Sequence, residues 1–390
     1  MEKILYILKH NPWGVGGGCY ASRGYLEAFT DICCNGYAID LCLCEEYVAS
    51  MDSETVQKYN VFGVKPRPAF SRYLSFLTGE MHRYNTNVRE LLKKNKYAYV
   101  FFDHNSIAGT LVHVAQANGA KIITLHHNYE PEYYRDNATN LIVLNLILPH
   151  VMKAEKRAYI QSDYNIFLTE EDQELFIKKY GDSKGKCGVI GSFEHKGVDI
   201  LPKVDACGER SKDRIKMVVT GSLSNIQNND GIQYLFKSLF KLIPEDCDLL
   251  LAGKNPTEEI TDIVKLYNNV TLIANPTNMS EVIANADVYL CTTRLGSGIK
   301  IRIMDGLRLG LPVLTHKISS RGYTIFEKTK SLFVFTDERE FEEKLIELIS
   351  RIRAGEVNKE SIRKLYKKHF SFNAGKDKLS SFIFHKVDNY

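Results

Sequence analysis

Short apolar runs alternate with segments of helical periodicity along most of the chain, and they form two successive series. The apolar runs of the first series lie at Ile4–Leu8, Tyr37–Cys44, Tyr99–Phe102, Lys121–Leu125 and Tyr164–Leu168. Those of the second series lie at Lys216–Thr220, Asp248–Leu251, Val270–Ile273, Val288–Cys291, Pro312–Thr315 and Leu332–Phe335. Helical segments lie between them, such as Ser22–Cys33, Thr86–Lys94 and Ile107–Asn118. Strands that alternate with helices are typical of a parallel sheet covered by helices, so the sequence predicts an α/β fold with two such sheets.

The two series are separated by a polar stretch around Gly188–Asp213, which is rich in Gly, Ser, Lys and Asp and contains Pro202. A chain of 390 residues is too long for one hydrophobic core. We therefore predict an N-terminal Rossmann-like domain over 1–195, a linker over 196–213 and a C-terminal Rossmann-like domain over 214–370. The segment 371–390 is predicted to form a helix that packs back on the N-terminal domain, because its phenylalanines need apolar partners.

Composition excludes several classes of protein. The net charge is only +4, without the dense basic clusters that most nucleic-acid-binding proteins carry. The nine cysteines form no Cys-x-x-Cys pair, so we interpret them as small buried side chains in a reducing compartment and expect no metal site. The N-terminus fits a first strand rather than a signal peptide, and the longest apolar stretch, Leu141–Leu148, is far shorter than the ~20 residues of a membrane-spanning helix. We therefore expect a cytoplasmic protein.

A glycine-rich segment, Gly14-Val-Gly-Gly-Gly18, follows the first predicted strand and precedes the helix predicted from Ser22. Glycines at such a turn let the backbone approach an anionic or hydroxyl-rich ligand, and the helix N-terminus supplies amide donors. We assign Gly17 and Gly18 to donor binding, with a tight turn that contacts no ligand as the alternative. Cys19 stands where a dinucleotide-binding fingerprint has its third glycine, which disfavours a nicotinamide-dependent oxidoreductase.

Polar residues close two strands of the first series, with Asp103-His104 after one and His126-His127-Asn128 after the next. Ligands bind at the carboxyl ends of parallel strands, and a histidine there can bond a hydroxyl or carry a proton. Adjacent residues of an extended segment point to opposite sides, so we expect one of the two histidines to reach the site. We choose His127 as the catalytic candidate and place Asp103, His126 and Asn128 at an acceptor-side rim. A structural loop histidine is the alternative.

The longest ordered motif runs from Gly296-Ser-Gly-Ile-Lys to Gly310-Leu-Pro-Val313, after the strand that ends at Cys291. Its glycines open a loop, and we predict that a helix begins near Ile299 and presents amides to an anion. Lys300 and Arg302 add positive charge that suits a diphosphate. Asp305 follows about one and a half turns later, where a carboxylate can accept hydrogen bonds from a ribose diol. The alternative is an amphipathic helix with a solvated basic face.

With these motifs, the segment 294–322 resembles the donor-binding segment of retaining GT-B glycosyltransferases of the family-4 type. The resemblance extends over roughly 1–340, through the glycine loop, the His-Asn after residue 126, Gly221-Ser222 with Asn228 and Asn229, and Leu250-Leu-Ala-Gly253. It implies two Rossmann-like domains that face each other across a cleft, with a helical C-terminal tail. The family often carries two glutamates eight positions apart, where this chain has Ser297 and Asp305. Its phosphate-binding Arg and Lys correspond to Ser222 and Asp230, and Lys300 and Arg302 are interpreted as their replacements.

The resemblance implies that the protein is a hexosyltransferase or a related enzyme that moves a sugar from a nucleoside-diphosphate sugar, with UDP preferred over GDP, to a glycan or lipid-linked acceptor. Transfer would retain the anomeric configuration and need no metal ion or other cofactor. The predicted donor-binding residues are Gly17, Gly18, Ser222, Gly298, Ile299, Ile301 and Arg302. Lys300 and the loop amides would stabilise the departing phosphate, His127 would contact the donor sugar with His126 as the fallback, and the phosphate itself could take the acceptor's proton.

The expected partners are the sugar donor and its acceptor, with no nucleic acid. Basic residues at 93, 94, 96, 153, 156 and 157, together with Leu141–Leu148, suggest a peripheral contact with the inner face of a membrane. A solvated charged face beside a buried helix is the alternative. The setting that the family implies is bacterial surface-polysaccharide synthesis. Two other functions stay open, namely a non-catalytic partner on the same scaffold, because Ser297 and Ser222 replace familiar side chains, and a nucleotide-sugar epimerase of the same fold.

Overall fold

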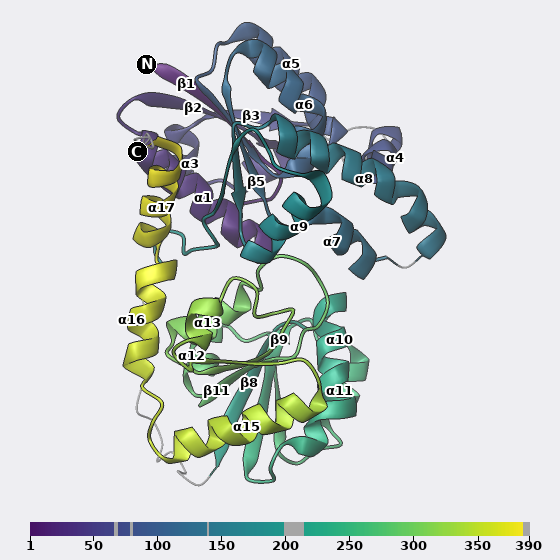
Figure 1. The fold of residues 1–390 in the computed structure, drawn as a ribbon, viewed down its shortest axis with the longest axis vertical. Coiled ribbons are helices and arrows are strands. Elements are labelled where there is room, and N and C mark those ends of the chain that lie inside the picture. The colour runs from purple at the N-terminus through teal and green to yellow at the C-terminus, as the bar shows by residue number, and fades with distance from the viewer. Residues whose placement is uncertain (66–68, 79–80, 139, 199–213, 385–390) are drawn as a thin grey trace. The chain divides into compact units, whose positions relative to one another are not determined.

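The protein divides into two compact units in a computed structural model that describes residues 1–65, 69–78, 81–138, 140–198 and 214–384 (Figure 1). The first unit comprises Met1–Lys196 together with Ser371–Tyr390, and the second comprises Gly197–Phe370. Most of the predicted linker, 196–213, lies outside the described residues. Each unit is built around its own parallel sheet, as the alternation of apolar runs predicts.

The first unit contains a seven-stranded sheet among the described residues, in the order β3-β2-β1-β4-β5-β6-β7. All adjacent strands pair in parallel. The strands are β1 (Glu2–Leu8), β2 (Tyr37–Cys44), β3 (Asn60–Val64), β4 (Tyr99–Asp103), β5 (Lys121–His126), β6 (Tyr164–Phe167) and β7 (Lys186–Val189). The order reverses direction between β1 and β4, where the carboxyl ends of two strands leave space for a ligand.

Helices connect these strands and cover the sheet (Figure 1). The α-helices of the first unit are α1 (Gly17–Cys33), α2 (Glu45–Val48), α3 (Ser53–Lys58), α4 (Ala69–Thr78), α5 (Asn85–Lys94), α6 (Asn105–Asn118), α7 (Glu130–Asp136), α8 (Leu141–Gln161), α9 (Glu170–Tyr180) and α17 (Phe372–Phe384). A short 3-10 helix, η1 (His82–Tyr84), precedes α5. The helix α6 ends where Gly119 adopts φ 87°, a left-handed conformation that glycine accepts at no cost from a Cβ.

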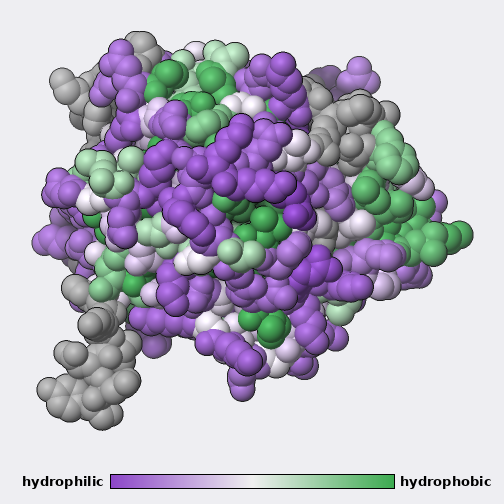
Figure 2. Space-filling model, turned by 90° about the horizontal axis from the view of Figure 1, so that it is seen from above, coloured by the Kyte–Doolittle hydropathy of each residue, from purple (hydrophilic) through white to green (hydrophobic). Residues whose placement is uncertain are grey.

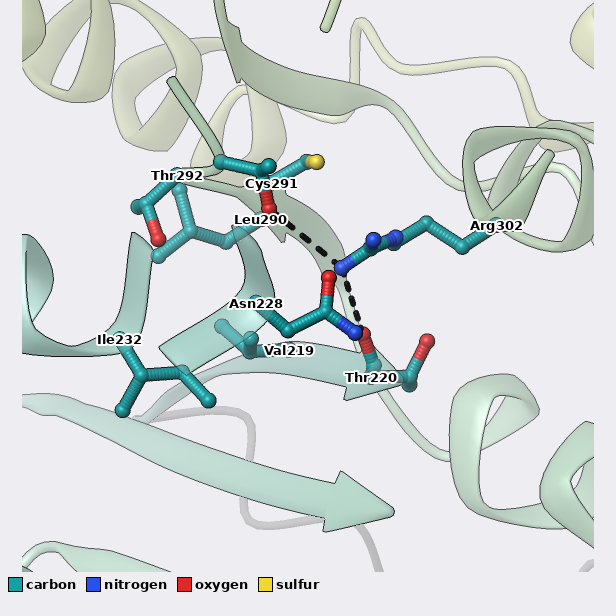
Figure 3. A pocket seen from close by; sticks show the side chains of 9 residues that line it. Val219, Thr220, Asn228, Ile232, Leu290, Cys291, Thr292 and Arg302 are labelled. Atoms are coloured by element: carbon teal, nitrogen blue, oxygen red, sulfur yellow. Dashed lines mark hydrogen bonds between the residues drawn. The ribbon is translucent and has the colours of Figure 1, made fainter. Parts of the chain in front are cut away.

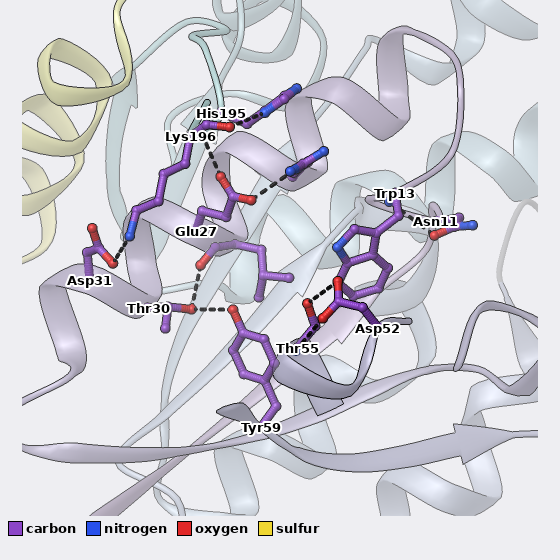
Figure 4. A network of polar contacts seen from close by, with 12 residues as sticks. Asn11, Trp13, Glu27, Thr30, Asp31, Asp52, Thr55, Tyr59, His195 and Lys196 are labelled. Carbon is purple, nitrogen blue, oxygen red and sulfur yellow. Dashed lines mark hydrogen bonds and ion pairs between the residues drawn. The ribbon is translucent and has the colours of Figure 1, made fainter. Parts of the chain in front are cut away.

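Polar contacts connect the helix α1 to Lys196, the last residue of the segment Met1–Lys196 (Figure 4). The backbone N–H of Lys196 donates to Glu27 Oε2 at 2.7 Å, and its ammonium donates to Asp31 Oδ1 at 2.6 Å. On the next turn, the Thr30 hydroxyl contacts the Tyr59 hydroxyl at 3.1 Å and donates to a backbone carbonyl. These contacts hold α1 in place, and α1 carries the glycine loop at its N-terminus.

The C-terminal helix α17 lies in the first unit, where its aromatic side chains contact sheet and helix residues. The ring of Phe384 lies 6.2 Å from that of Phe29 on α1 and 5.6 Å from that of Tyr99 on β4. Phe382 packs edge-on against Tyr164 of β6. The backbone of α17 reaches Phe193 closely at Gly375, where no Cβ intervenes.

The second unit contains a six-stranded parallel sheet among the described residues, in the order β10-β9-β8-β11-β12-β13. Its strands are β8 (Ile215–Ser222), β9 (Cys247–Lys254), β10 (Val270–Ala274), β11 (Val288–Cys291), β12 (Val313–His316) and β13 (Leu332–Phe335). Its α-helices are α10 (Ile226–Tyr234), α11 (Glu258–Val264), α12 (Met279–Ala284), α13 (Arg302–Arg308), α14 (Thr324–Glu327), α15 (Glu338–Arg353) and α16 (Lys359–Phe370). A π-helical segment, η2 (Leu235–Leu239), and a 3-10 segment, η3 (Phe240–Leu242), follow α10. The order reverses between β8 and β11, which places a second ligand-binding edge there.

The predicted strands are confirmed, with each end within three residues of its predicted position. Two edge strands were not predicted, β3 and β7, because they are short and only partly buried, and each contains a glycine. Two helix starts were wrong. The helix α1 begins at Gly17 rather than Ser22, and the helix after the second glycine loop begins at Arg302 rather than Ile299.

Candidate functional site

The glycine loop of the first unit lies exposed directly before α1, at the carboxyl end of β1. Gly16 has φ 135°, which side-chain-bearing residues rarely adopt, and Gly17 and Gly18 form the first turn of α1. This turn contains no acidic residue and no capping side chain, so its amides face outward with a positive dipole. A Cβ on Gly18 would lie 2.9 Å from His10 Nε2, so glycine also makes room for that imidazole.

Behind the loop, three buried side chains form a chain of hydrogen bonds. The Ser22 hydroxyl of α1 donates to Asp103 Oδ2 at 2.5 Å, and Asp103 Oδ1 lies 3.0 Å from His127 Nε2. All three residues are buried. Because an ionised Asp103 can only accept, it holds the proton of His127 on Nε2 and leaves Nδ1 as an acceptor.

A second group of polar residues lies beside this chain. His104 stacks on His127 with ring centroids 5.4 Å apart, and His10 packs edge-on against both rings. Lys9 Nζ lies 2.9 Å from His104 Nε2, and Glu130 Oε1 lies 3.3 Å from the same nitrogen. Burial lowers the pKa of His104 well below its usual value and lowers that of His10 to about 2, with the neighbouring charged and imidazole groups acting in the same direction. Both imidazoles are therefore neutral at physiological pH.

His126 lies on the other side of β5, away from this cluster. Its ring is fully buried, stacks on Phe167 at 4.8 Å and packs edge-on against Phe176 at 4.7 Å. Its Nε2 contacts Asn165 Oδ1 at 2.9 Å. The alternation of side chains along an extended segment therefore separates the two histidines, and the assignment of His126 to the rim is corrected to a core position. Asn128 is half-buried in the turn that follows.

The corresponding loop of the second unit, between β11 and α13, is folded back into the protein. Gly296 and Gly298 have φ 92° and 69°, and the segment between them is buried. The Lys300 ammonium donates to the Ser297 carbonyl at 3.1 Å, and the Tyr323 hydroxyl donates to the Lys300 carbonyl at 3.0 Å. Two left-handed residues and a buried lysine thus fix the loop's path.

Arg302 begins α13 and extends over a small pocket at the carboxyl ends of β8 and β11 (Figure 3). Its guanidinium donates to the Thr220 carbonyl at 3.5 Å and to the Thr293 hydroxyl at 3.4 Å. Gly221 leaves room for this guanidinium, because a Cβ at that position would lie 3.2 Å from Arg302 Nη1. The pocket is lined by Val219, Thr220, Asn228, Ile232, Leu290, Cys291, Thr292, Thr293 and Arg302.

Two buried polar atoms in this region have no hydrogen-bond partner among the described residues, Asn228 Oδ1 and Ser297 Oγ. The same Asn228 side chain donates through Nδ2 to the carbonyl of Ser222, at the end of β8. Buried polar atoms without partners are rare in folded proteins, and they often mark a site that a ligand or water completes.

Asp305 lies on α13 with its side chain 43% exposed and its Oδ1 3.6 Å from Arg308. Desolvation by the surrounding protein raises the pKa of the carboxyl above its ordinary value, and Arg308 opposes this effect. Ser222 is exposed at the end of β8, and Ile299 and Ile301 are half-buried on either side of Lys300. The structure thus places Ser222 and Arg302 at the β8–β11 edge, with Gly298 and Lys300 on the loop before Arg302 and Asp305 on the helix that Arg302 begins.

Sequence reasoning missed several residues of these two edges. Asp230, aligned with a family lysine, receives a bidentate ion pair from Arg294 at 2.9 and 3.1 Å. Lys9 and His10 were not predicted to belong to a site. The available signal was their position, because both directly follow β1, at the carboxyl edge that also holds Asp103 and His127.

Within the part of the chain that the structure describes, no group of three or more His, Cys, Asp or Glu side chains has the geometry to hold a metal ion. Among the same residues, no helix is long and apolar enough to cross a membrane.

Comparison with known proteins agrees with this architecture. The family model "Glycosyl transferases group 1" matches residues 214–351, which lie within the second unit. A glycosyltransferase from Rickettsia africae superposes with a TM-score of 0.67 at 15% identity, covering 99% of each chain. The sucrose-phosphate synthase of Thermosynechococcus elongatus gives a TM-score of 0.70 at 14% identity over 98% of each chain. The chain has the GT-B fold.

A third similar structure is Anabaena HepE in complex with UDP, with a TM-score of 0.64 at 14% identity over 98% of this chain and 99% of the other. No curated protein matches the sequence. At identities this low, the similarity establishes the fold, and the GT-B arrangement expected from the sequence is confirmed at that level. The chemistry has to be argued from the two edges.

Proposed function

We propose that the protein is a glycosyltransferase that moves a sugar from a nucleoside-diphosphate sugar to a glycan or lipid-linked acceptor. The observation that carries the proposal is Arg302, a half-buried cation above a small pocket, within the segment that matches the glycosyl transferases group 1 model. Among the described residues its hydrogen bonds go to a carbonyl and a hydroxyl and to no carboxylate, so its positive charge is available to an anion.

The surroundings of Arg302 favour a diphosphate. Lys300 adds a second cation on the preceding turn, and Asn228 Oδ1 and Ser297 Oγ are buried polar atoms that lack a partner. In contrast, the charge of Arg294 is neutralised by Asp230. We infer that Arg302 and Lys300 take the place of the family's phosphate-binding pair and that Asp305 accepts hydrogen bonds from the ribose diol.

The chemistry that we propose is transfer with retention at the anomeric carbon, without a metal ion. The diphosphate would leave from the face that the acceptor attacks, and the loop amides around Gly298 together with the two cations would stabilise its developing charge. In the first unit, Gly17 and Gly18 would contact the donor, and His127 would present Nδ1 to a sugar hydroxyl because Asp103 holds its other nitrogen.

The choice of UDP over GDP draws on two similar structures. Anabaena HepE was solved with UDP and with UDP-glucose. Another similar structure is WaaG, a glycosyltransferase involved in lipopolysaccharide biosynthesis, with a TM-score of 0.63 at 13% identity. They support a uridine donor and a role in bacterial surface-polysaccharide assembly for this chain.

A nucleotide screen tests the proposal. UDP, GDP, ADP, CMP and dTDP are compared by thermal shift and calorimetry, and UDP is expected to bind. Arg302→Gln should weaken UDP about 10- to 100-fold, because a charge-assisted hydrogen bond contributes roughly 1.5–3 kcal/mol. Asp305→Ala should weaken it as well. Arg339→Gln removes a charge from the exposed face of α15 in the same unit and should leave binding unchanged. Absence of binding by every nucleotide would contradict the donor site.

Product analysis then separates the alternatives. Incubation with UDP-sugars and acceptors should give sugar transferred to an acceptor. Binding of UDP with no transfer to any acceptor would favour a non-catalytic partner on this scaffold, a reading that Ser297 in place of a family glutamate keeps open. An altered sugar, with no acceptor product, would indicate an epimerase.

We further propose that the first unit contacts a membrane through an apolar edge, defined as the exposed side chains of α4 and of the first half of α8. These are Phe70, Tyr73, Phe76, Leu141, Ile142 and Leu146, with exposures from 49% to 75%. Figure 2 shows apolar side chains gathered on the side to which these two helices extend in Figure 1. Exposed aromatic and aliphatic side chains of this kind favour the interface of a bilayer. Arg157 does not contribute, because it donates to the Gly109 carbonyl at 2.8 Å.

Flotation with vesicles of phosphatidylglycerol and phosphatidylethanolamine tests this contact. The wild type should float, and the double variant Ile142→Ser/Leu146→Ser should lose most of the floating fraction. Leu266→Ser/Ile346→Ser exchanges equally exposed side chains of the second unit and serves as the matched control. A wild type that stays in the soluble fraction at low salt would refute the contact, and so would equal loss in both double variants.

A further inference from the structure

The helix α13 carries three charged side chains at intervals of three residues, namely Arg302, Asp305 and Arg308. Residues three apart are neighbours on a helix surface, so Asp305 lies next to both arginines. A donor site of the proposed kind needs Arg302 free to bind an anion and Asp305 free to accept hydrogen bonds. If these two side chains paired with each other, the site would lose both groups.

Asp305 pairs with Arg308 instead. Its Oδ1 lies 3.6 Å from Arg308 Nη2, whereas no ion pair joins it to Arg302 among the described residues. The order along the helix favours this choice, because an acidic side chain that precedes its basic partner is aligned with the helix dipole. The Arg302 guanidinium donates to the Thr220 carbonyl at 3.5 Å and to the Thr293 hydroxyl at 3.4 Å.

Arg308 is itself held in place by contacts outside α13. Its Nη2 donates to the Ser280 hydroxyl on α12 at 3.0 Å, and its Nη1 donates to the Val198 carbonyl at 3.5 Å. The Arg308 side chain is only 11% exposed, while that of Asp305 is 43% exposed. The ion pair therefore joins an anchored, largely buried cation to a carboxylate that a ligand in solvent can still reach.

We propose that Arg308 is a positioning residue of the donor site, which holds Asp305 away from Arg302 so that one helix presents a free cation beside an accessible carboxylate. This rests on the proposed function, which assigns those two groups to the diphosphate and the ribose. Arg308 acts through Asp305 and does not itself bind the donor. Desolvation raises the pKa of the Asp305 carboxyl and Arg308 lowers it, so the same contact favours the ionised form that accepts hydrogen bonds.

Inorganic pyrophosphate tests the separation of the two groups, because it resembles the donor's diphosphate but has no ribose. Arg308→Gln releases the Asp305 carboxylate, which can then turn to Arg302 and compete with the anion. Pyrophosphate should therefore bind about tenfold more weakly in calorimetry. Arg308→Lys keeps a cation beside Asp305 and should retain most of the wild-type affinity. Unchanged pyrophosphate binding in Arg308→Gln would refute the proposal.

Arg363→Gln is the matched control for structural damage at α13. Arg363 is a half-buried arginine on α16 that donates to the Leu309 carbonyl, directly after α13, at 3.0 and 3.2 Å. Its ion pair among the described residues is with Glu360, outside the proposed site. This variant should lower thermal stability and leave pyrophosphate binding unchanged. Equal loss of affinity in Arg308→Gln and Arg363→Gln would mean that both had merely loosened α13, which would contradict a positioning role.

A double-mutant cycle separates this role from a general effect of charge. In the Arg308→Gln background, Asp305→Asn removes the competing carboxylate and should restore most of the lost pyrophosphate affinity. In the wild-type background the same change should strengthen binding by less than about twofold, because Arg308 already engages the carboxylate. An equal effect in the two backgrounds would show that Asp305 acts on the anion only from a distance, and it would overturn the role of Arg308.

A crystal structure of the nucleotide-free Arg308→Gln variant tests the geometry without any ligand. We expect the Asp305 carboxylate to lie within hydrogen-bond distance of the Arg302 guanidinium, and a carboxylate that keeps its wild-type position would overturn the proposal. Failure of the wild type to bind both pyrophosphate and UDP would refute the donor site instead. The structure of the variant would then still decide whether Arg308 keeps the two groups apart.

Discussion

Gly306 on α13 lies against the ring of Tyr289 on β11. A single methyl group added at position 306 tests whether the packing of this helix positions the proposed donor-binding residues. The Cβ of an alanine at 306 would lie 2.7 Å from Tyr289 Cγ, 2.8 Å from its Cβ and 2.9 Å from its Cδ2. These atoms are the root of a fully buried side chain whose hydroxyl contacts Thr220 at 2.6 Å, so they cannot move aside.

The expected magnitude follows from these distances. Carbon atoms pack at about 3.5–4.0 Å, so α13 must move by roughly 1 Å to accommodate the methyl group. Overpacking of this kind costs about 1–3 kcal/mol, while alanine gains about 1 kcal/mol over glycine in a helix. Because all three contacts are shorter than 3.0 Å, we take the upper part of the overpacking range, about 2–3 kcal/mol, and expect a net loss of about 1–2 kcal/mol. Because Arg302 and Asp305 lie on the same helix, UDP should also bind about tenfold more weakly.

Scanning calorimetry and UDP titration measure the two effects. For a unit of this size the loss corresponds to a decrease in Tm of roughly 2–8 °C. Gly36→Ala is the control, because nothing lies within 4 Å of an added Cβ at that position. Gly306→Ala combined with Tyr289→Ala should lose less stability than the sum of the two single losses, because the added methyl group no longer meets the ring. A Gly306→Ala variant that is as stable as the wild type and binds UDP equally well would refute the reasoning.

Two further predictions concern the first unit. Burial raises the pKa of Glu155 well above its usual value. Above about pH 4.3 the unfolded state has therefore released a proton that the native state still binds, and the free energy of unfolding falls as the pH rises toward the raised pKa. Glu155→Gln should flatten this dependence and gain stability over the wild type between pH 5 and 8 in urea unfolding, and parallel curves would contradict this. Gly375→Ala places a Cβ against the ring of buried Phe193, so it should destabilise α17 by about 1–3 kcal/mol despite the better helix propensity of alanine. Faster hydrogen exchange in α17 would show this effect, and unchanged exchange would argue against the packing.

The strands could be predicted from the sequence because a buried parallel strand needs a continuous apolar run. The run at Tyr37–Cys44 has the bounds of β2, and the runs at Val288–Cys291 and Leu332–Phe335 have those of β11 and β13. The strands β3 and β7 could not be found this way, because both are short, partly exposed and interrupted by a glycine, so neither shows a continuous apolar run. The position of β7 at the boundary of the first unit also made its glycine look like part of a linker.

The loops that carry the candidate site residues were predicted in outline. Those after β1, β5 and β11 could be located because glycines or histidines follow apolar runs. The assignment of His126 to the rim failed because an extended segment sends alternate side chains to opposite faces, and nothing local says which face is the core. Asp230 and Arg294 are 64 residues apart, so their pairing depends on the distance between two loops rather than on any motif.

The sequence by itself determined the α/β class, the two successive series of strands and the edges where polar residues gather, because these depend on local periodicity and on which residues follow each strand. The tertiary structure decided which of those residues meet. It brought Ser22 to Asp103, Lys9 to His104 and Arg302 to Gly221, contacts that join segments far apart in the chain. It also fixed the tautomer of His104, because the ring's Nδ1 accepts the backbone N–H of Ser106, a contact that cannot be read from composition or spacing.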